Sequence, residues 1–200
     1  MKEMDTDIFN LSDEQPAPLR GSLLVARPTV GDPCFGRSVI AMMHHDTDGS
    51  MGLILNRITN LCLSDVLDDM ELSEKIPVYL GGPVNPELMF YIHDLGPDVI
   101  ADATKVTDGL YLGGDGDSMK AYLSSGAPIE GHVRFFVGYS GWDAGQLMEE
   151  IRRHDWVVLD GDNREMMLHW RHEGMWDEAV SRFGDRYRLW RNWPLEPTDN

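Results

Sequence analysis

The sequence has few cysteines, no long apolar run and no leader-like beginning. Its two cysteines, Cys34 and Cys62, lack the CxxC spacing of a zinc or redox site, so we expect two reduced and mostly buried thiols. No stretch approaches the roughly 18 apolar residues of a membrane-spanning helix. Residues 1–5 are polar and acidic, without the apolar core of a signal peptide. These absences predict a protein of the cytoplasm that has no membrane contact.

Positive charge is also scarce. Lys and Arg number 17 against 34 Asp and Glu, which gives a net charge of −17. Nucleic-acid binding depends largely on cationic side chains that release counterions from phosphates, so direct binding to DNA or RNA is not expected. The acidity is uneven, because residues 60–120 hold 12 acids and 3 lysines, whereas residues 151–193 hold 8 arginines and 8 acids. Exposed carboxylates over 60–120 would favour a basic partner.

The length of 200 residues indicates one domain that is large enough to bury a core. Residues 1–19 are polar, acidic and contain proline, and we predict that they form a mobile lead-in. Residues 20–200 would then form the single domain.

Secondary structure was inferred from short apolar runs and from the residues that bound them. Strands are predicted at 21–26, 37–43, 52–57, 78–80, 90–93, 133–137 and 156–159, with 37–57 as a hairpin. Helices are predicted at 118–123, 143–153 and 176–183, with a short helix after Ser64 and a helical turn at 86–89. Strands outnumber helices and do not alternate regularly with them, which favours an α+β fold.

The chain is organised around residues 133–153. An apolar strand is followed by GYSGW at 138–142, which is typical of a tight turn. Asp143 is predicted to cap a helix, with Gln146 in the capping-box position three residues later. Leu147, Met148 and Ile151 fall on one face of that helix. The pattern therefore predicts a strand–turn–helix unit.

Several motifs in a fixed order resemble one family. They are GSLLVA at 21–26, FGRSVI at 35–40, GLILNR at 52–57, GGPV at 81–84, FYIH at 90–93, GYSGW at 138–142 and GQL at 145–147. Together they resemble the AlgH/YqgE family of bacterial proteins over about residues 21–159, while residues 160–200 match less clearly. The resemblance implies a cytosolic α+β domain whose bifurcated, mostly antiparallel β-sheet curls into a pseudo-barrel flanked by helices. It implies no settled activity, and the family's association with regulation of alginate biosynthesis is not evidence of DNA contact.

Ser140 suggests a hydrolase, because it lies between glycines on a strand–turn–helix pattern similar to a nucleophile elbow. The elbow requires Gly-x-Ser-x-Gly, however, and Trp142 stands where the second glycine belongs. The family usually has alanine at the position of Ser140, which removes the nucleophile from any shared chemistry. We therefore predict no catalytic residue.

The candidate metal and anion sites also have simpler structural explanations. His44, His45 and Asp46 are adjacent and point in different directions, so they do not predict a metal site. The backbone N–H groups at the start of the predicted 143–153 helix, and the turn at Gly81 and Gly82, could receive an anion, but tight-turn geometry is the favoured explanation for both. No metal or cofactor is predicted.

A ligand site is predicted where polar and aromatic residues of the motifs converge on one face. Its members are Arg37, Asn56, Arg57, Gly81, Gly82, His93, Tyr139, Trp142 and Gln146. The alternative is a satisfied hydrogen-bond network around irregular turns. Similarly, the tryptophans at 170, 176, 190 and 193 either form an interface or pack on the core.

Our leading hypothesis is a non-enzymatic regulatory domain that binds a small ligand or a protein partner. The alternatives are an uncharacterised enzyme, hydrolase-like and using Ser140 or a histidine, and a transcriptional regulator. No helix-turn-helix pattern with a basic recognition helix supports direct regulation of transcription.

Overall fold

The computed structural model describes residues 15–67, 70, 72, 75–169 and 171–193. Most of the predicted lead-in, residues 1–14, therefore lies outside the described residues. From residue 15 the chain contacts the sheet, because the Gln15 side chain accepts a hydrogen bond from the Val158 N–H (3.0 Å) and donates one to the Trp156 carbonyl (3.3 Å).

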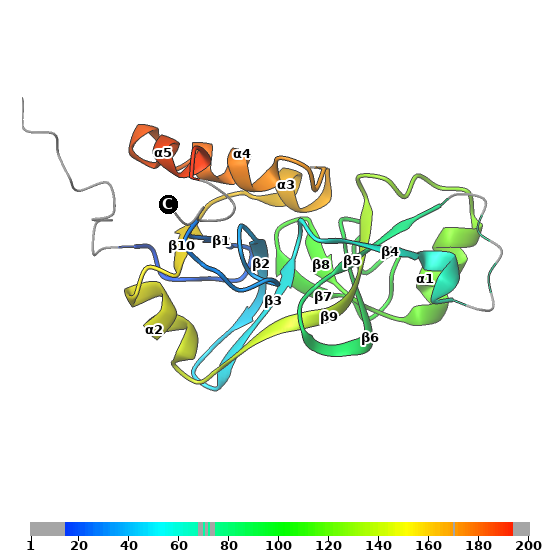
Figure 1. The fold of residues 1–200 in the computed structure, drawn as a ribbon. Helices are drawn as coiled ribbons and strands as arrows, with labels where there is room; N and C mark the ends of the chain where they lie inside the picture. Colours follow the sequence, from blue (N-terminus) through cyan, green and yellow to red (C-terminus); the bar gives the residue numbers. More distant parts are fainter. Residues whose placement is uncertain (1–14, 68–69, 71, 73–74, 170, 194–200) are drawn as a thin grey trace, which may run out of the picture.

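A mostly antiparallel sheet of ten strands forms the centre of the molecule (Figure 1). Its main path runs in the order β10-β1-β2-β3-β9-β6-β8-β7, and the sheet is open, with β10 and β7 at the ends of this path. The strands are β1 Leu23–Ala26, β2 Val39–His45, β3 Gly49–Ile54, β4 Ile58–Cys62, β5 Pro77–Leu80, β6 Val84–His93, β7 Thr104–Thr107, β8 Leu110–Leu112, β9 Val133–Asp143 and β10 Trp156–Leu159.

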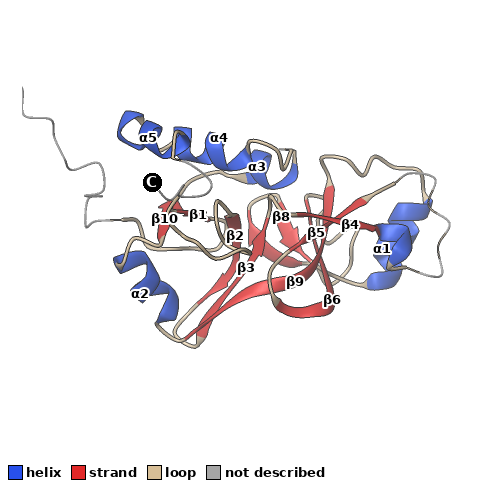
Figure 2. Ribbon diagram, viewed as in Figure 1, coloured by secondary structure: helices blue, strands red, loops and turns tan. Residues whose placement is uncertain are grey.

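Helices cover both faces of this sheet and one of its ends (Figure 2). They are α1 Gly116–Ser124, α2 Gln146–Arg152, α3 Arg164–Leu168, α4 Met175–Ser181 and α5 Arg188–Arg191, with 3₁₀ turns η1 Leu63–Asp65 and η2 Asp185–Tyr187. Helices α3 to α5 lie along one side, α2 lies on the other, and α1 lies at the far end (Figure 1). Among the described residues, no helix is long and apolar enough to cross a membrane.

Strand β1 explains why two helical layers are needed. Alternate side chains of a strand point to opposite faces, so Leu23 and Val25 enter one core and Leu24 enters another. The first core includes Trp176 of α4, and the second includes Leu147 of α2. A third core lies beneath α1 and contains β5 and β9 side chains.

Two of the C-terminal tryptophans pack on the domain's own core. Trp176 and Trp190 are buried, and the Trp176 indole donates to the Ala26 carbonyl at 2.8 Å. Trp193 is partly exposed, and Trp170 lies outside the described residues. Packing on the core is thus the observed role for Trp176 and Trp190.

The sheet branches at β9, because this strand changes partner along its length. Residues 135–137 pair with β5 in parallel, residues 140–143 pair with β3, and β6 follows residues 133–139. The pairing with β5 is the parallel exception in a mostly antiparallel sheet. The bifurcated sheet that the family resemblance implied is confirmed.

Two glycines allow the strands to meet at this branch. The Gly81 N–H donates to the Val137 carbonyl at 2.8 Å, and its carbonyl accepts from the Ile54 N–H at 2.9 Å. A Cβ at Gly81 would lie 2.3 Å from the Gly138 carbonyl oxygen, closer than any real contact. Gly138 itself has φ +66°, which favours glycine. We call the contact of Gly81 with Gly138 the branch contact.

The predicted strand–turn–helix unit is wrong in its middle. GYSGW does not turn but continues β9 to Asp143, because residues 140–143 pair with β3. The following helix begins at Gln146 after Gly145, which has φ +76°, so Asp143 is not its N-cap. The Gln146 side chain still accepts the Asp143 N–H at 3.0 Å. Residues 86–89 likewise lie in β6 and form no helical turn.

Replacing Gly81 with alanine tests the branch contact. We expect Gly81→Ala to lower the free energy of unfolding by about 3 kcal/mol, since the new methyl group meets rigid backbone. Gly116→Ala is the control, because space around this helical glycine is open and alanine stabilises helices by about 0.5–1 kcal/mol. Urea denaturation measures both, and an unchanged midpoint for Gly81→Ala would contradict the tight contact.

Candidate functional site

The structure distributes the nine residues predicted to bind a ligand over several places. Asn56 joins the end of β3 to the start of β2, since its Oδ1 accepts from the Val39 N–H and its Nδ2 donates to the Arg37 carbonyl, both at 2.9 Å. Arg57 donates to the Gly36 carbonyl. These side chains hold the loop that precedes β2 and use their polar groups on backbone partners.

Arg37 contacts the C-terminal segment. Its guanidinium carbon lies 4.9 Å from the centre of the Trp176 ring and it donates to the Trp193 carbonyl. Its φ of 52° is unusual for a residue with a side chain. Arg37 therefore connects the β2 loop to the helical layer, and it lines neither of the two cavities that Trp142 lines.

Gly81, Gly82 and His93 are buried and do not lie on an exposed face. The His93 Nε2 lies 3.0 Å from the Gly113 carbonyl, so Nε2 carries a proton and donates it to this carbonyl. Its Nδ1 is buried without a hydrogen-bond partner among the described residues. Burial lowers the pKa of His93 below its ordinary value. A polar face that includes these three residues is thus not what the structure shows.

Trp142 and Gln146 meet at a carboxylate of α2. Glu150 accepts from the Trp142 indole N–H (2.8 Å), the Trp156 indole N–H (2.8 Å) and the Gln146 amide (2.9 Å). The two indole rings pack edge to face at 6.1 Å. Three donors satisfy this carboxylate, so the cluster fixes α2 against the sheet.

Tyr139 and Trp142 also line an open hollow beside the β2–β3 turn, which we call the hairpin hollow. Its volume is about 490 Å³, and its wall consists of His44, Asp46, Asp48, Gly49, Ser50, Met51, Asn85, Leu88, Phe90, Tyr139 and Trp142. The Phe90 and Tyr139 rings pack edge to face at 5.7 Å. Leu88 is 46% exposed and adds an apolar side chain to this wall. No Lys or Arg belongs to this wall.

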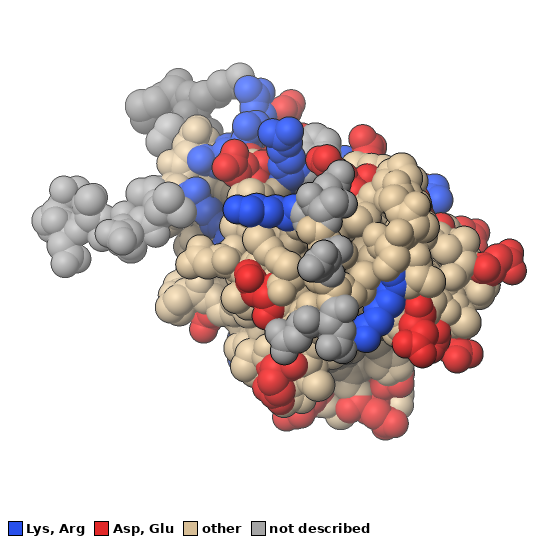
Figure 3. Space-filling view, turned by 90° about the vertical axis from the view of Figure 1, so that its right-hand side faces the viewer, with Lys and Arg blue, Asp and Glu red and all other residues tan. Residues whose placement is uncertain are grey.

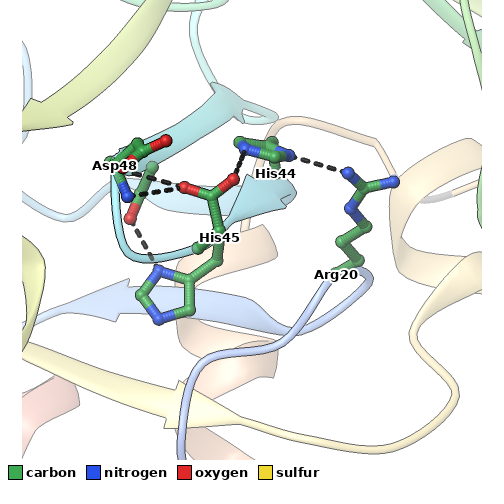
Figure 4. A network of polar contacts seen from close by, with 7 residues as sticks. Arg20, His44, His45 and Asp48 are labelled. Atoms are coloured by element: carbon green, nitrogen blue, oxygen red, sulfur yellow. Dashed lines mark hydrogen bonds and ion pairs between the residues drawn. The ribbon is translucent and has the colours of Figure 1, made fainter. Parts of the chain in front are cut away.

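A network of polar contacts shapes the hairpin side of the hollow (Figure 4). Arg20 contacts His44 Nδ1 at 2.7 Å, and His44 Nε2 contacts Asp46 at 2.7 Å. Because a guanidinium only donates, Nδ1 accepts and Nε2 donates to the carboxylate. The other Asp46 oxygen accepts from the backbone N–H groups of Asp48 (2.8 Å) and Gly49 (3.2 Å). These contacts lower the pKa of Asp46, with the Asp48 N–H as the largest cause, and keep its negative charge.

His45 takes no part in the chain of contacts from Arg20 to Asp46. Its Nδ1 lies 2.7 Å from the Ser50 hydroxyl. No group of three potential metal ligands occurs in the described parts of the chain. The network is therefore a structural support for an acidic rim.

Ser140 does not have the surroundings of a nucleophile. It is fully buried in β9, and its hydroxyl donates to the Gly81 carbonyl at 3.1 Å. A substrate cannot reach this oxygen in the folded protein. The hydroxyl instead adds a hydrogen bond at the branch contact.

The sequence prediction missed Leu88 and Asp48 as parts of the hollow. Residues 86–89 resembled a helical turn, whereas a strand pattern would have placed Leu88 on the side of Phe90. It also missed Arg134, a buried cation within the apolar run of β9. A charged residue in an otherwise apolar strand was the available signal.

Comparison with known proteins gives consistent matches. A family model described as AlgH-like matches residues 23–188. A UPF0301 protein of Parabacteroides distasonis is 41% identical over 193 residues, which cover 96% of each chain. A UPF0301 protein of Bacteroides fragilis is 39% identical over 197 residues, which cover 98% of this chain and 99% of the relative. These names state no activity.

Solved structures share the fold. The solution structure of the AlgH protein from Pseudomonas aeruginosa matches with a TM-score of 0.68 and 26% identity, covering 90% of this chain and 98% of that chain. A crystal structure of a Corynebacterium diphtheriae protein matches with a TM-score of 0.71 and 22% identity, covering 88% and 93%, which shows the fold alone. The α+β class is confirmed.

The buried neutral His93 predicts a specific dependence of stability on pH. In the unfolded chain its pKa returns to about 6.5. Below this pH, His93 binds a proton in the unfolded state, whereas burial disfavours the charged ring in the folded state. The free energy of unfolding therefore decreases as the pH is lowered, by up to about 1.4 kcal/mol per pH unit. The contribution of the neutral His93 to the free energy of unfolding is fully present above about pH 6.5.

The variant His93→Gln keeps a donor for the Gly113 carbonyl but does not titrate. We expect urea denaturation between pH 7 and pH 5 to show a shallower loss of stability for His93→Gln than for the wild type. His169→Gln, a change at an exposed histidine, should retain the wild-type slope. Equal slopes for the wild type and His93→Gln would show that His93 charges freely in the fold.

Proposed function

The chain belongs to the AlgH-like family, and we propose that it is a non-enzymatic, cytoplasmic regulatory domain that binds a basic protein partner. The hairpin hollow receives a Lys or Arg side chain of that partner. One observation carries this proposal: the wall of the hollow combines three aromatic rings and two carboxylates with no cationic residue.

The aromatic part of the wall suits the stem and the charge of a long cationic side chain. Such a side chain packs its methylene groups on apolar surface, here Leu88 and Phe90, and places its charge near aromatic faces. Tyr139 and Phe90 already pack edge to face, so their positions are set before binding. This pre-organisation reduces the ordering that binding requires.

The carboxylates complete the recognition. Asp46 is held by His44 and by backbone N–H groups, whereas the Asp48 side chain is exposed at the rim. The net charge of −17 adds a long-range attraction for a basic partner and repels nucleic-acid phosphates. A binding role without chemistry also agrees with the buried position of Ser140.

A peptide titration tests the proposal. The probe is acetyl-Leu-Arg-Leu-amide, with acetyl-Leu-Gln-Leu-amide as the uncharged comparison, and the readout is the ¹⁵N–¹H NMR spectrum. We expect the arginine peptide to shift the amides of Leu88 and Tyr139 and the Trp142 indole, and the glutamine peptide to shift them much less.

Two variants separate charge from packing. Asp48→Asn should weaken binding about threefold, because an exposed ion pair contributes up to about 1 kcal/mol. Tyr139→Ala should weaken it about tenfold by removing an aromatic wall. Asp117→Asn, which makes the same charge change on the exposed surface of α1, should have no effect. Equal shifts with both peptides would overturn the charge-based proposal, and shifts elsewhere would overturn the location.

A further inference from the structure

A second cavity, on the other branch of the sheet, has the opposite charge. Its volume is about 290 Å³, and it lies where β5 and β9 begin, next to the end of α3. Its wall consists of Lys75, Ile76, Pro77, Tyr79, Ile129, Glu130, Gly131, Val133, Arg134, Leu168, His169 and Arg171. Three of these residues are cationic and one is acidic. We call this cavity the arginine pocket.

Arg134 is the innermost cation of the pocket and is only 6% exposed. Its guanidinium donates to the Met167 carbonyl at 3.0 Å and to the Leu55 carbonyl at 2.8 Å. Its central carbon lies 4.2 Å from the centre of the Tyr79 ring. All three partners are neutral, and no carboxylate of the described residues forms an ion pair with Arg134.

A buried charge without a counter-charge is unusual, because desolvation of an ion is costly unless the ion is paired. Burial lowers the pKa of Arg134, and the nearby Tyr79 opposes this effect. The two carbonyls and the ring hold the guanidinium in place but do not neutralise it. The site therefore retains an uncompensated positive charge inside a protein of net charge −17.

Lys75 and Arg171 are exposed and form no ion pair within the described parts of the chain. By contrast, five arginines between residues 153 and 191 form ion pairs with carboxylates. The pairs are Arg153 with Asp155, Arg164 with Asp162, Arg182 with Glu178, Arg188 with Asp185 and Arg191 with Asp177. The arginine pocket thus gathers cations that the acidic chain leaves unpaired.

On the face that Figure 3 shows, acidic and basic side chains are distributed unevenly. Separate groups of carboxylates lie over its lower and right-hand parts, and most Lys and Arg side chains lie toward its upper part, where they are mixed with some carboxylates. The net charge of −17 repels an approaching anion at long range. Only a local cluster of cations can attract and hold it.

Apart from Glu130 and His169, the rest of the wall is largely apolar. Ile76, Pro77, Ile129, Val133 and Leu168 supply aliphatic surface, and the Tyr79 ring forms part of the floor beside Arg134. A cavity with apolar walls and a few convergent charges is typical of a site for a small molecule. A ligand with a charged head and a compact apolar body matches this arrangement.

We propose that the arginine pocket binds a small organic anion, whose carboxylate or phosphate head lies among Lys75, Arg134 and Arg171 and whose apolar body contacts the aliphatic wall. Guanidinium groups bind both kinds of head through charge-assisted hydrogen bonds. The site is separate from the hairpin hollow, because the two cavities share no residue. It does not depend on the proposed partner binding.

Isothermal titration calorimetry with two probes tests this proposal and distinguishes the two heads. The probes are benzoate and phenyl phosphate, and inorganic phosphate serves as an anion without an apolar body. We expect at least one aromatic probe to bind, with an affinity at least tenfold higher than that of inorganic phosphate. The probe with the higher affinity shows whether the pocket prefers a carboxylate or a phosphate head. Failure of both to bind at millimolar concentration would overturn the proposal.

A charge-neutralised variant locates the site. The double variant Lys75→Gln, Arg171→Gln changes only exposed residues, and we expect it to weaken the bound probe at least tenfold. Arg188→Gln with Lys105→Gln removes the same charge from exposed positions outside the pocket and should leave the affinity unchanged. Equal weakening in both double variants would mean that general electrostatic attraction, and not the pocket, holds the probe.

NMR gives an independent readout on the same samples. Probe binding should shift the amides of Gly131 and Val133 in the wild type and leave those of Ser50 and Leu88 in place. Shifts confined to other parts of the protein would contradict the assignment to the arginine pocket, whatever the calorimetric affinity.

Discussion

The branch contact between Gly81 and Gly138 is the constraint on which the rest of the structure depends. At this point the backbone of Gly81 hydrogen-bonds to β9 through its N–H and to β3 through its carbonyl, and the Ser140 hydroxyl donates to the same carbonyl. No side chain fits between the two glycines. Because the backbones approach so closely, β9 can pair with β5 along one part of its length and with β3 along the next. One strand thereby builds both branches of the sheet.

The two candidate binding sites lie on different branches and have opposite charge. The hairpin hollow uses the β3 side, with Asp46 and Asp48 at its rim, whereas the arginine pocket uses the β5 side, with Arg134 at its floor. A basic partner and a small anion can then bind without competing for the same surface. Strand β9 contributes to both candidate sites, through Tyr139 and Arg134.

Much of the fold could be predicted from the sequence, but the site could not. Apolar runs identified β1, β2, β5 and β10 because buried strands need continuous or alternating apolar residues. GYSGW was misread as a turn, because glycine marks close backbone approach as well as turns, and only the pairing with β3 distinguishes the two. Asn56 and His93 looked like ligand-binding groups, yet their polar atoms contact backbone of distant segments. Lys75, Arg134 and Arg171 come from three separate segments, so counting charges along the chain could not find the pocket.

Hydrogen exchange at the branch tests the central claim most directly. The amides of Ile54 and Gly81 donate two backbone hydrogen bonds at this branch, to the Gly81 carbonyl and to the Val137 carbonyl. If the branch contact holds the fold together, these amides exchange only when the whole protein unfolds, with the free energy obtained from denaturation. We expect that result, with faster exchange through local opening at the β2–β3 turn. Exchange of the Ile54 and Gly81 amides at a clearly lower free energy than those of β1 and β2 would show that the branch opens independently and would contradict the account.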